Sequence, residues 1–345
     1  MKIYDTSICI MRMFILSIAI ILVLTAIPQS SCADGKIADA KRLDKRAESV
    51  LEKAQLLQSL DALDEDESDK ICDFAIQYEE AEWIKTRVYK TPFHDDIALT
   101  LQNIASLYQF CHAPMAQKYL QSVLSIKEKL YTKESEEAAS AHDALADFNR
   151  FYMMEFKKAI THYKEAKRIR VKLYGKKDSR ITKNYNSLAI TLYYHKGEKS
   201  MAEQLILEAI SIKETSPVNG IFPVYKAYMD AGIYYSMRSS YESAILYFEK
   251  ALQKGDLIQD SDEITILSEL GMIYMNKDNL KTSFKYSKNA YEKAKNLYKK
   301  SPTPNFLQHI EQLLDIYNML GDKKSANRLK VEHKETREQL LKGKS

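Results

Sequence analysis

Histidine is the first residue type to examine for chemistry, because imidazole acts as a general base and as a metal ligand near neutral pH. The chain has seven histidines, and they do not repeat at a spacing expected of metal ligands: His94, His112, His142, His162, His195, His309 and His333. We interpret His162, beside Tyr163, as a packing or surface residue. The sequence also contains no HExxH, no Gly-rich phosphate loop and no GxSxG motif. We therefore predict a protein that is not an enzyme and that holds no cofactor and no metal.

Cysteine is the other residue type that could carry chemistry here. The four cysteines are Cys9, Cys32, Cys72 and Cys111, and none of them forms a CxxC or a Cys/His metal spacing. If the N-terminal segment is removed, Cys72 and Cys111 remain. They form one disulfide or stay as two buried apolar thiols, and both alternatives are open.

The N-terminal residues have the order of a secretory signal. Lys2 and Arg12 precede an apolar stretch from Met13 to Ile27, and Pro28 follows. A helix over that stretch is roughly 22 Å long, which is shorter than a ~30 Å hydrocarbon core. We predict a signal peptide over residues 1–33 with cleavage near Ala33, and therefore an exported protein, periplasmic or secreted.

Two alternatives keep the chain at a membrane. The signal could remain uncleaved as an anchor, or Cys32 could carry a lipid. Lipidation departs from the usual bacterial lipoprotein pattern, because Gln29 stands where that pattern has an aliphatic residue.

The clearest feature of the sequence is an internal repeat, which indicates a repetitive architecture. Similar segments contain Ile84, Ile126, Ile169 and Ile212, spaced by 42, 43 and 43 residues. Small residues recur in three further registers. The first is Ala81, Ala166, Ala209, Ala251 and Ala290, with Val123 in the one gap; the second is Ala105, Ala146, Ala189, Gly232 and Gly271; the third is Ala116, Ala159, Ala202, Ala244 and Ser283, with Ala326 as a possible last member.

Small residues at fixed intervals predict points where two helices cross closely, with bulky residues filling the space around them. Tyrosines recur in register too, at Tyr108, Tyr235, Tyr274 and Tyr317 and at Tyr89, Tyr131, Tyr174 and Tyr298. We interpret them as core packing with the hydroxyl at the edge, in preference to aromatic recognition. The sequence thus predicts antiparallel helix pairs stacked side by side.

This pattern resembles the tetratricopeptide repeat (TPR). The longer interval resembles the kinesin light chain type, whose Ala-x-x-Ile-Arg/Lys-Glu-x-Leu pattern is matched here by residues 123–130, with Val123 in place of the Ala. The resemblance covers roughly residues 70–345 and implies an all-α, right-handed superhelical solenoid of antiparallel helix hairpins. It indicates the fold rather than a function.

The repeat predicts the following organisation. N-terminal helices over 34–94 form an atypical first repeat or cap, with helices at 36–60 and 71–89 separated by the acidic run 61–69. Five TPR-like repeats follow over 95–303, with bounds of 95–137, 138–179, 180–219, 220–262 and 263–303. Residues 304–345 form a degenerate C-terminal repeat or capping helices.

Charge gives little indication of a partner. With 51 basic and 47 acidic residues the net charge is +4, which carries no nucleic-acid signature. One basic band stands out: Lys164, Lys167, Arg168, Arg170, Lys172, Lys176, Lys177, Arg180 and Lys183. It is either a docking patch for an acidic protein or membrane, or a solvated outer face, and we favour the second.

A solenoid of this kind is expected to bind along its concave wall, which the first helix of each unit lines. The predicted groove residues lie three positions before, one position after and four positions after each member of the second register of small residues. They are Gln102, Ser106 and Gln109; Asp143, Asp147 and Arg150; Asn186, Ile190 and Tyr193; and Met229, Ile233 and Ser236. Some related proteins clamp a terminal carboxylate here with Lys, Arg and Asn. Only Arg150 and Asn186 could contribute, so we predict no such clamp.

The sequence therefore favours a non-enzymatic, exported scaffold that binds a peptide or partner helix in the groove. The alternative is a sensory or regulatory TPR module for a small peptide or ligand, anchored to a membrane by an uncleaved signal. We predict a protein or peptide partner of unknown identity, no nucleic acid, and membrane contact only through the signal or a lipidated Cys32.

Overall fold

The protein is built from helices that pair and stack along an arc. The computed structural model describes residues 32–182, 184–195, 198–215, 223–255, 258–299 and 303–342, and no strand occurs among them. The predicted fold class, an all-α solenoid of antiparallel helix hairpins, is confirmed. Residues 1–31, with most of the predicted signal peptide, lie outside the described residues.

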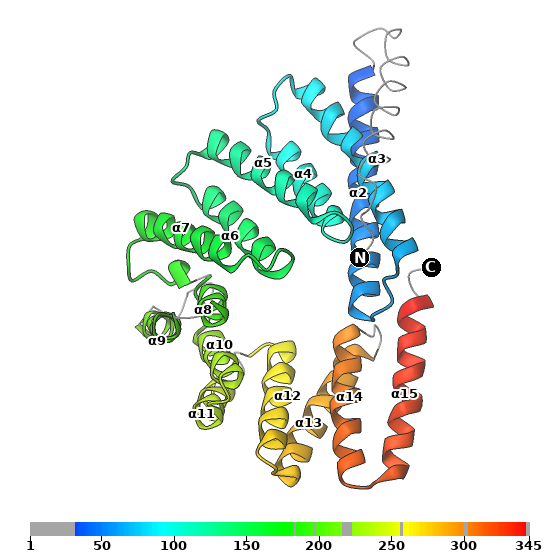
Figure 1. The fold of residues 1–345 in the computed structure, drawn as a ribbon, viewed down its shortest axis with the longest axis vertical. Coiled ribbons are helices and arrows are strands. Elements are labelled where there is room, and N and C mark those ends of the chain that lie inside the picture. Colours follow the sequence, from blue (N-terminus) through cyan, green and yellow to red (C-terminus); the bar gives the residue numbers. More distant parts are fainter. Residues whose placement is uncertain are drawn as a thin grey trace.

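Consecutive helices form the hairpins, and each hairpin packs on the next (Figure 1). The pairs are α2 (Cys32–Ser59) with α3 (Glu65–Tyr89), α4 (Asp95–Tyr108) with α5 (Ala113–Tyr131), α6 (Glu136–Phe151) with α7 (Phe156–Tyr174), α8 (Tyr185–Tyr194) with α9 (Lys199–Thr215), α10 (Val224–Met237) with α11 (Tyr241–Leu252), α12 (Asp260–Asn276) with α13 (Leu280–Tyr298), and α14 (Pro304–Met319) with α15 (Lys323–Lys342). A short 3-10 helix, η1 (Ser179–Thr182), precedes α8.

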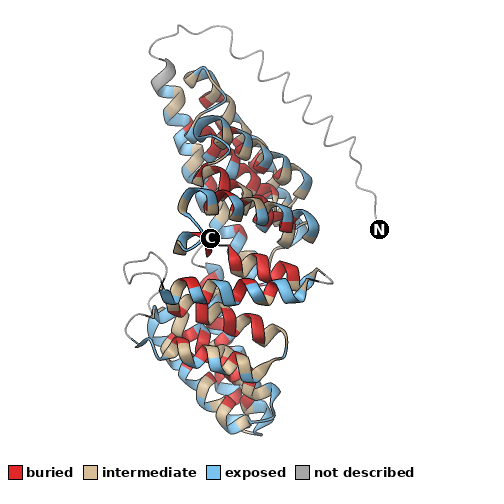
Figure 2. Cartoon of the chain, turned by 90° about the vertical axis from the view of Figure 1, so that its left-hand side faces the viewer, coloured by how far each residue is buried: buried red, intermediate tan, exposed pale blue. Residues whose placement is uncertain are grey.

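The small residues lie where helices cross, as their spacing predicts. Figure 2 shows buried residues along the faces where helices meet and exposed residues on the outward faces. A β-carbon at Gly232 would lie 2.5 Å from the Phe248 ring, and one at Gly271 would overlap the Ser287 hydroxyl. The Ser283 hydroxyl, itself buried, donates to the Gly271 carbonyl at 2.8 Å. A side chain larger than these would push the two helices of a hairpin apart.

The tyrosines of the second helices are hydrogen-bonded to carboxylates near the start of first helices. Tyr174 donates to Glu136 at 3.2 Å and Tyr131 donates to Asp95, each within its own hairpin, whereas Tyr89 of α3 donates to Asp96 of the following α4 at 2.5 Å. Tyr108 and Tyr235, in the first helices, are buried. This arrangement agrees with the interpretation of the tyrosines as packing residues.

Helix α3 begins earlier than the sequence suggested. We expected a loop over the acidic run 61–69, but α3 starts at Glu65. Asp64 caps the helix, since its carboxylate accepts from the Glu67 amide at 2.9 Å. Glu65, Asp66 and Glu67 occupy the first turn, where negative charge is stabilised by the helix dipole. The acidic run is therefore partly a helix start.

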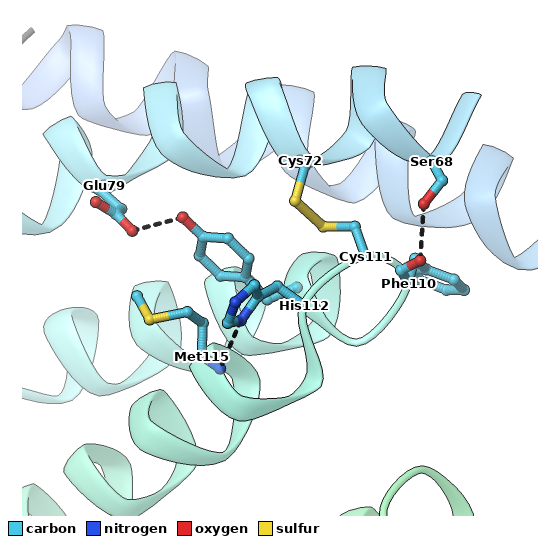
Figure 3. Close-up of a disulfide and its surroundings, with 8 residues drawn as sticks. Ser68, Cys72, Glu79, Phe110, Cys111, His112 and Met115 are labelled. Carbon is cyan, nitrogen blue, oxygen red and sulfur yellow. Dashed lines mark hydrogen bonds between the residues drawn. A yellow bond between two sulfur atoms is a disulfide. The ribbon is translucent and has the colours of Figure 1, made fainter. Parts of the chain in front are cut away.

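A disulfide joins the first two hairpins. Cys72 of α3 is bonded to Cys111, in the turn between α4 and α5, with 5.9 Å between their Cα atoms (Figure 3). Beside it, the Ser68 hydroxyl donates to the Phe110 carbonyl at 2.9 Å. Of the two alternatives left open by the sequence, the structure has the disulfide.

The two ends of the array meet. In Figure 1 the lower end of α2 lies against α14 and α15, so the arc closes into a ring. Leu60, after α2, is buried in one apolar cluster with Phe306, Leu307 and Leu340. Arg337 of α15 donates from Nη2 to the Leu60 carbonyl at 2.8 Å. This contact is called the closing contact below.

We expect that replacing Arg337 with Ala, together with Leu60→Asp, opens the ring. Arg337 places a cation at the C-terminus of α2, a contact worth about 1 kcal/mol, and Leu60 supplies the apolar part. Small-angle X-ray scattering should show a larger maximum dimension and radius of gyration, with unchanged helical content by circular dichroism. Arg328→Ala, at an exposed position of the same helix, should leave the scattering curve unchanged. An unchanged curve for the double variant would contradict the closing contact.

Candidate functional site

The first helices of the hairpins face the interior of the arc. In Figure 1, α6, α8 and α10 lie on the inner side, and α7, α9 and α11 lie on the outer side. Most of the predicted groove residues on α4, α6, α8 and α10 are at least partly exposed, including Gln102 and Asp147. The inner wall is therefore accessible over several consecutive units.

Ile190 is an exception, and its prediction as a groove residue is wrong. Only 7% of its surface is exposed. An aliphatic side chain at this position is more stable packed among its neighbours than in water, so it is not available to a ligand. Its neighbour in the prediction, Tyr193, is half-buried, and its hydroxyl donates to the Met237 carbonyl at 3.2 Å.

Two pockets occupy equivalent places in the repeat. The first, of about 320 Å³, is lined by Gln102 of α4, by Lys127 and neighbours of α5, and by Ser140 and neighbours of α6. The second, of about 210 Å³, is lined by Asn186 of α8, by Lys213 and neighbours of α9, and by Lys226, Ala227 and Asp230 of α10. In each, two successive first helices form the walls and the second helix between them forms the floor. The repeat thus generates recurring depressions between units.

A series of cations lies at the position after the repeated isoleucine, and the sequence interpretation missed its role. Lys85 is 2% exposed and pairs with Asp44 at 2.8 Å. Lys127 of α5 pairs with Asp95 at 2.7 Å, at the start of the first helix of its own hairpin. Lys213 is half-buried, and burial lowers its pKa to about 8. The register of these cations, one residue after each Ile, was the signal that could have revealed them.

Arg170 is the most buried member of the series, and its assignment to a solvated basic band is wrong. None of its surface is exposed. Its Nη2 donates to Asp143 at 2.6 Å and to Glu136 at 3.0 Å, and its Nε also reaches Glu136 at 3.1 Å. Asp143, which was predicted to line the groove wall, therefore forms an internal ion pair with Arg170.

The rest of the basic band is largely paired on the surface. Arg168 contacts Glu165 and Glu134, and Lys167 contacts Glu208 at 3.2 Å. Arg180 binds Asp178 at 2.8 Å and lowers the pKa of that carboxyl to about 2. Partners of opposite charge neutralise much of the band, which agrees with the solvated-face interpretation.

Three carboxylates near the inner wall lack such partners. Asp147 accepts a hydrogen bond from the Tyr163 hydroxyl, and Asp230 accepts one from Asn186 Nδ2 at 3.1 Å. Burial raises the pKa of Asp147 and of Glu269, and raises that of Asp230 to about 7. Within the described residues none of the three forms an ion pair. We refer to them as the unpaired carboxylates.

The histidines do not assemble a reactive centre in the described part of the chain. His142 and His162 face each other across α6 and α7, with 2.9 Å between their Nδ1 atoms. Desolvation lowers the pKa of both, so the pair is neutral at pH 7 and one ring donates to the other. No group of three or more His, Cys, Asp or Glu side chains in the described ranges could hold a metal ion.

The arrangement of helices can be compared with that of known proteins. The sequence matches no protein-family model and no curated protein. Among solved structures, the apo form of the quorum sensor NprR from B. thuringiensis is 13% identical, with 93% of this chain and 92% of that chain covered and a TM-score of 0.46. The apo form of RapI is 15% identical, with 78% and 93% covered and a TM-score of 0.46. A putative kinesin light chain from Podosopora anserina with nearly identical TPR-like repeats is 14% identical, with 71% and 96% covered and a TM-score of 0.36 or less.

The chain's own hairpins, stacked through registers of small residues, give it a TPR-like fold. Among the helices described here, none is both long and apolar enough to cross a bilayer.

Proposed function

We propose that this TPR-like protein is an exported, non-enzymatic scaffold that binds an extended peptide or a partner helix along its inner wall. The observation that carries the proposal is the recurrence of the two pockets at equivalent places between units. Their spacing suits a ligand that runs across several units and places side chains into successive depressions. A small ligand would need one enclosed cavity instead.

The disulfide supports the exported location. Disulfides such as Cys72–Cys111 persist in secreted and periplasmic proteins, and they are rare where thiols are kept reduced. The apolar stretch from Met13 to Ile27, with its basic flank, supports the same location. The mature N-terminus, measured by mass spectrometry, tests this part: a start near Asp34 agrees with export, and a retained Met1 contradicts cleavage.

Site-specific photocrosslinking tests the groove. A photoreactive amino acid is placed at Gln102 or Met229, on inner helices, and at Leu207 or Leu246, which are exposed on the outer helices α9 and α11. The full chain is expressed with its own N-terminal segment and irradiated in cells. We expect adducts with one common partner from the inner positions and none from the outer positions. Adducts from the outer positions alone, or from no position, would refute binding in the groove.

A further inference from the structure

We propose that the hairpin of α6 and α7 is an acid-sensitive switch, which loosens when His142 and His162 both acquire an additional proton. The two side chains come from the two helices of this hairpin, and their Nδ1 atoms are 2.9 Å apart. We call this pair the histidine contact. The proposal concerns the array itself, so it does not depend on the binding of a partner in the groove.

The repeat pattern shows that histidine is unusual at these two places. His142 lies four positions before Ala146 of the second register of small residues, and His162 lies three positions after Ala159 of the third. In four other hairpins the equivalent positions hold leucine or tyrosine: Leu101 with Tyr119, Tyr185 with Leu205, Tyr228 with Tyr247, and Leu267 with Tyr286. All eight of these side chains are at least partly buried. Among these five hairpins, α6–α7 alone has imidazoles where the others have packing residues.

The geometry of the histidine contact limits the number of protons that it can hold. The ring centroids are 5.2 Å apart, so the rings face each other through the two Nδ1 atoms. A hydrogen bond between them needs one Nδ1 with a proton and one without. The neutral pair meets this condition, and so does the pair with one added proton on an Nε2 atom. A second added proton would give both Nδ1 atoms an N–H group and break the hydrogen bond.

The charged groups around the histidine contact come from three helices. Glu128 acts on it from α5 and Asp143 from α6, and Glu165 and Arg168 act on it from α7. Helix α8, which also packs on α7, contains no charged residue. Asp143 is already paired with Arg170, and Glu165 with Arg168, whereas Glu128 forms no ion pair within the described ranges. One added charge on the histidine contact can therefore be balanced by Glu128, and a second one lacks such a counter-ion.

Acid should therefore destabilise this hairpin. In the unfolded chain the two imidazoles are separate, with pKa values of about 6.5, and each binds a proton below that pH. Desolvation lowers the pKa of both rings in the folded protein, and the contact holds at least one proton fewer than the separate rings. A state that binds more protons is favoured as the pH falls, so the unfolding equilibrium constant should rise about tenfold per pH unit below about pH 6.

The position of the switch connects it to the inner wall. Helix α6 carries Asp147 and Arg150, both predicted to line the groove. A loosened hairpin changes the position of these side chains, so acid would alter the wall at this unit.

NMR of the purified protein counts the protons on the histidine contact directly. The 13C chemical shifts of the histidine Cε1 atoms are followed from about pH 8 to about pH 5, with signals assigned through His142→Leu and His162→Tyr single variants. We expect the two rings together to take up no more than one proton over this range while the protein stays folded. Uptake of two protons near pH 6.5 in the folded protein would overturn the proposal.

A matched variant tests the effect on stability. His142→Leu with His162→Tyr introduces the residues that α12–α13 has at Leu267 and Tyr286, so it should fold. Urea unfolding followed by circular dichroism gives the unfolding equilibrium constants of both proteins at about pH 7.5, 6 and 5. The ratio of the wild-type constant to that of the variant should rise about tenfold from pH 6 to pH 5, a change of about 1.4 kcal/mol. Other titrating groups are common to both proteins and cancel in the ratio.

Hydrogen exchange measured by mass spectrometry locates the effect. At about pH 5, α6 and α7 should exchange faster in the wild type than in the double variant, whereas α12 and α13 should exchange alike in both. An equal pH dependence of stability in the two proteins, or equal exchange in α6 and α7, would overturn the proposal. If the double variant does not fold, the proton count by NMR still decides. None of these measurements involves a partner, so their outcome is independent of the photocrosslinking that tests the groove.

Discussion

Arg170→Met is expected to lower the free energy of unfolding by about 3 kcal/mol. The substitution keeps most of the side-chain volume and removes the charge that Glu136 and Asp143 share, with N–O distances of 3.0 and 2.6 Å. Both carboxylates would then lie between α6 and α7 without a cation. Breaking one side of a buried ion pair costs more than the pair is worth, because the remaining charge stays desolvated. Denaturant unfolding followed by circular dichroism measures the change.

Two further variants separate this explanation from a loss of packing. Arg168→Met, two residues away on the surface, should change the midpoint little, because its ion pairs with Glu134 and Glu165 are exposed. Adding Glu136→Gln and Asp143→Asn to Arg170→Met should recover part of the lost stability, since no unpaired charge then remains. A triple variant as unstable as Arg170→Met would attribute the loss to packing instead.

Reduction of the Cys72–Cys111 disulfide is the second large effect. The bond closes a loop of 39 residues, and the chain-entropy model assigns such a loop up to about 4 kcal/mol of stabilisation. A reductant should therefore shift the unfolding midpoint of the protein to clearly lower denaturant concentration. The loss should concern the first two hairpins most, because the bond joins α3 to the turn after α4.

The matched control is the double variant Cys72→Ala, Cys111→Ala. It should unfold at the same midpoint with and without reductant, near that of the reduced wild-type protein. If the wild-type midpoint does not respond to reductant, or if the double variant responds equally, the disulfide does not stabilise the fold.

The sequence predicted the packing well because the small residues at helix crossings recur at regular intervals along the chain. Ala146 and Gly232, in one register of small residues, lie at helix crossings, and a β-carbon at Gly232 would collide with Phe248. A crossing admits only small residues, so their spacing identifies it from the sequence alone.

The start of α3 was misplaced for a different reason. Acidic residues occur both in solvated loops and in the first turns of helices, and composition does not separate the two.

The candidate site was less predictable, because side-chain burial depends on neighbouring units. Arg170 is one of many basic residues on α7, and only the approach of Glu136 and Asp143 distinguishes it from the exposed Arg168. Ile190 followed the correct register, yet it is buried at its place on α8. The unpaired state of Asp147 and Glu269 is a property of their surroundings, which no periodicity encodes. The closing contact is likewise absent from the repeat pattern.

The closing contact changes how the array should unfold. In an open array each terminal unit has one neighbour, so the ends fray first and stability is a sum of nearest-neighbour terms. Here Arg337 and Leu60, 277 residues apart in the sequence, give the first and last units a second neighbour each. A ring has no end from which fraying can begin, and its longest-range contact forms only after the intervening units are folded. Hydrogen exchange at α2 and α15 should therefore be slower than terminal helices would show in an open array.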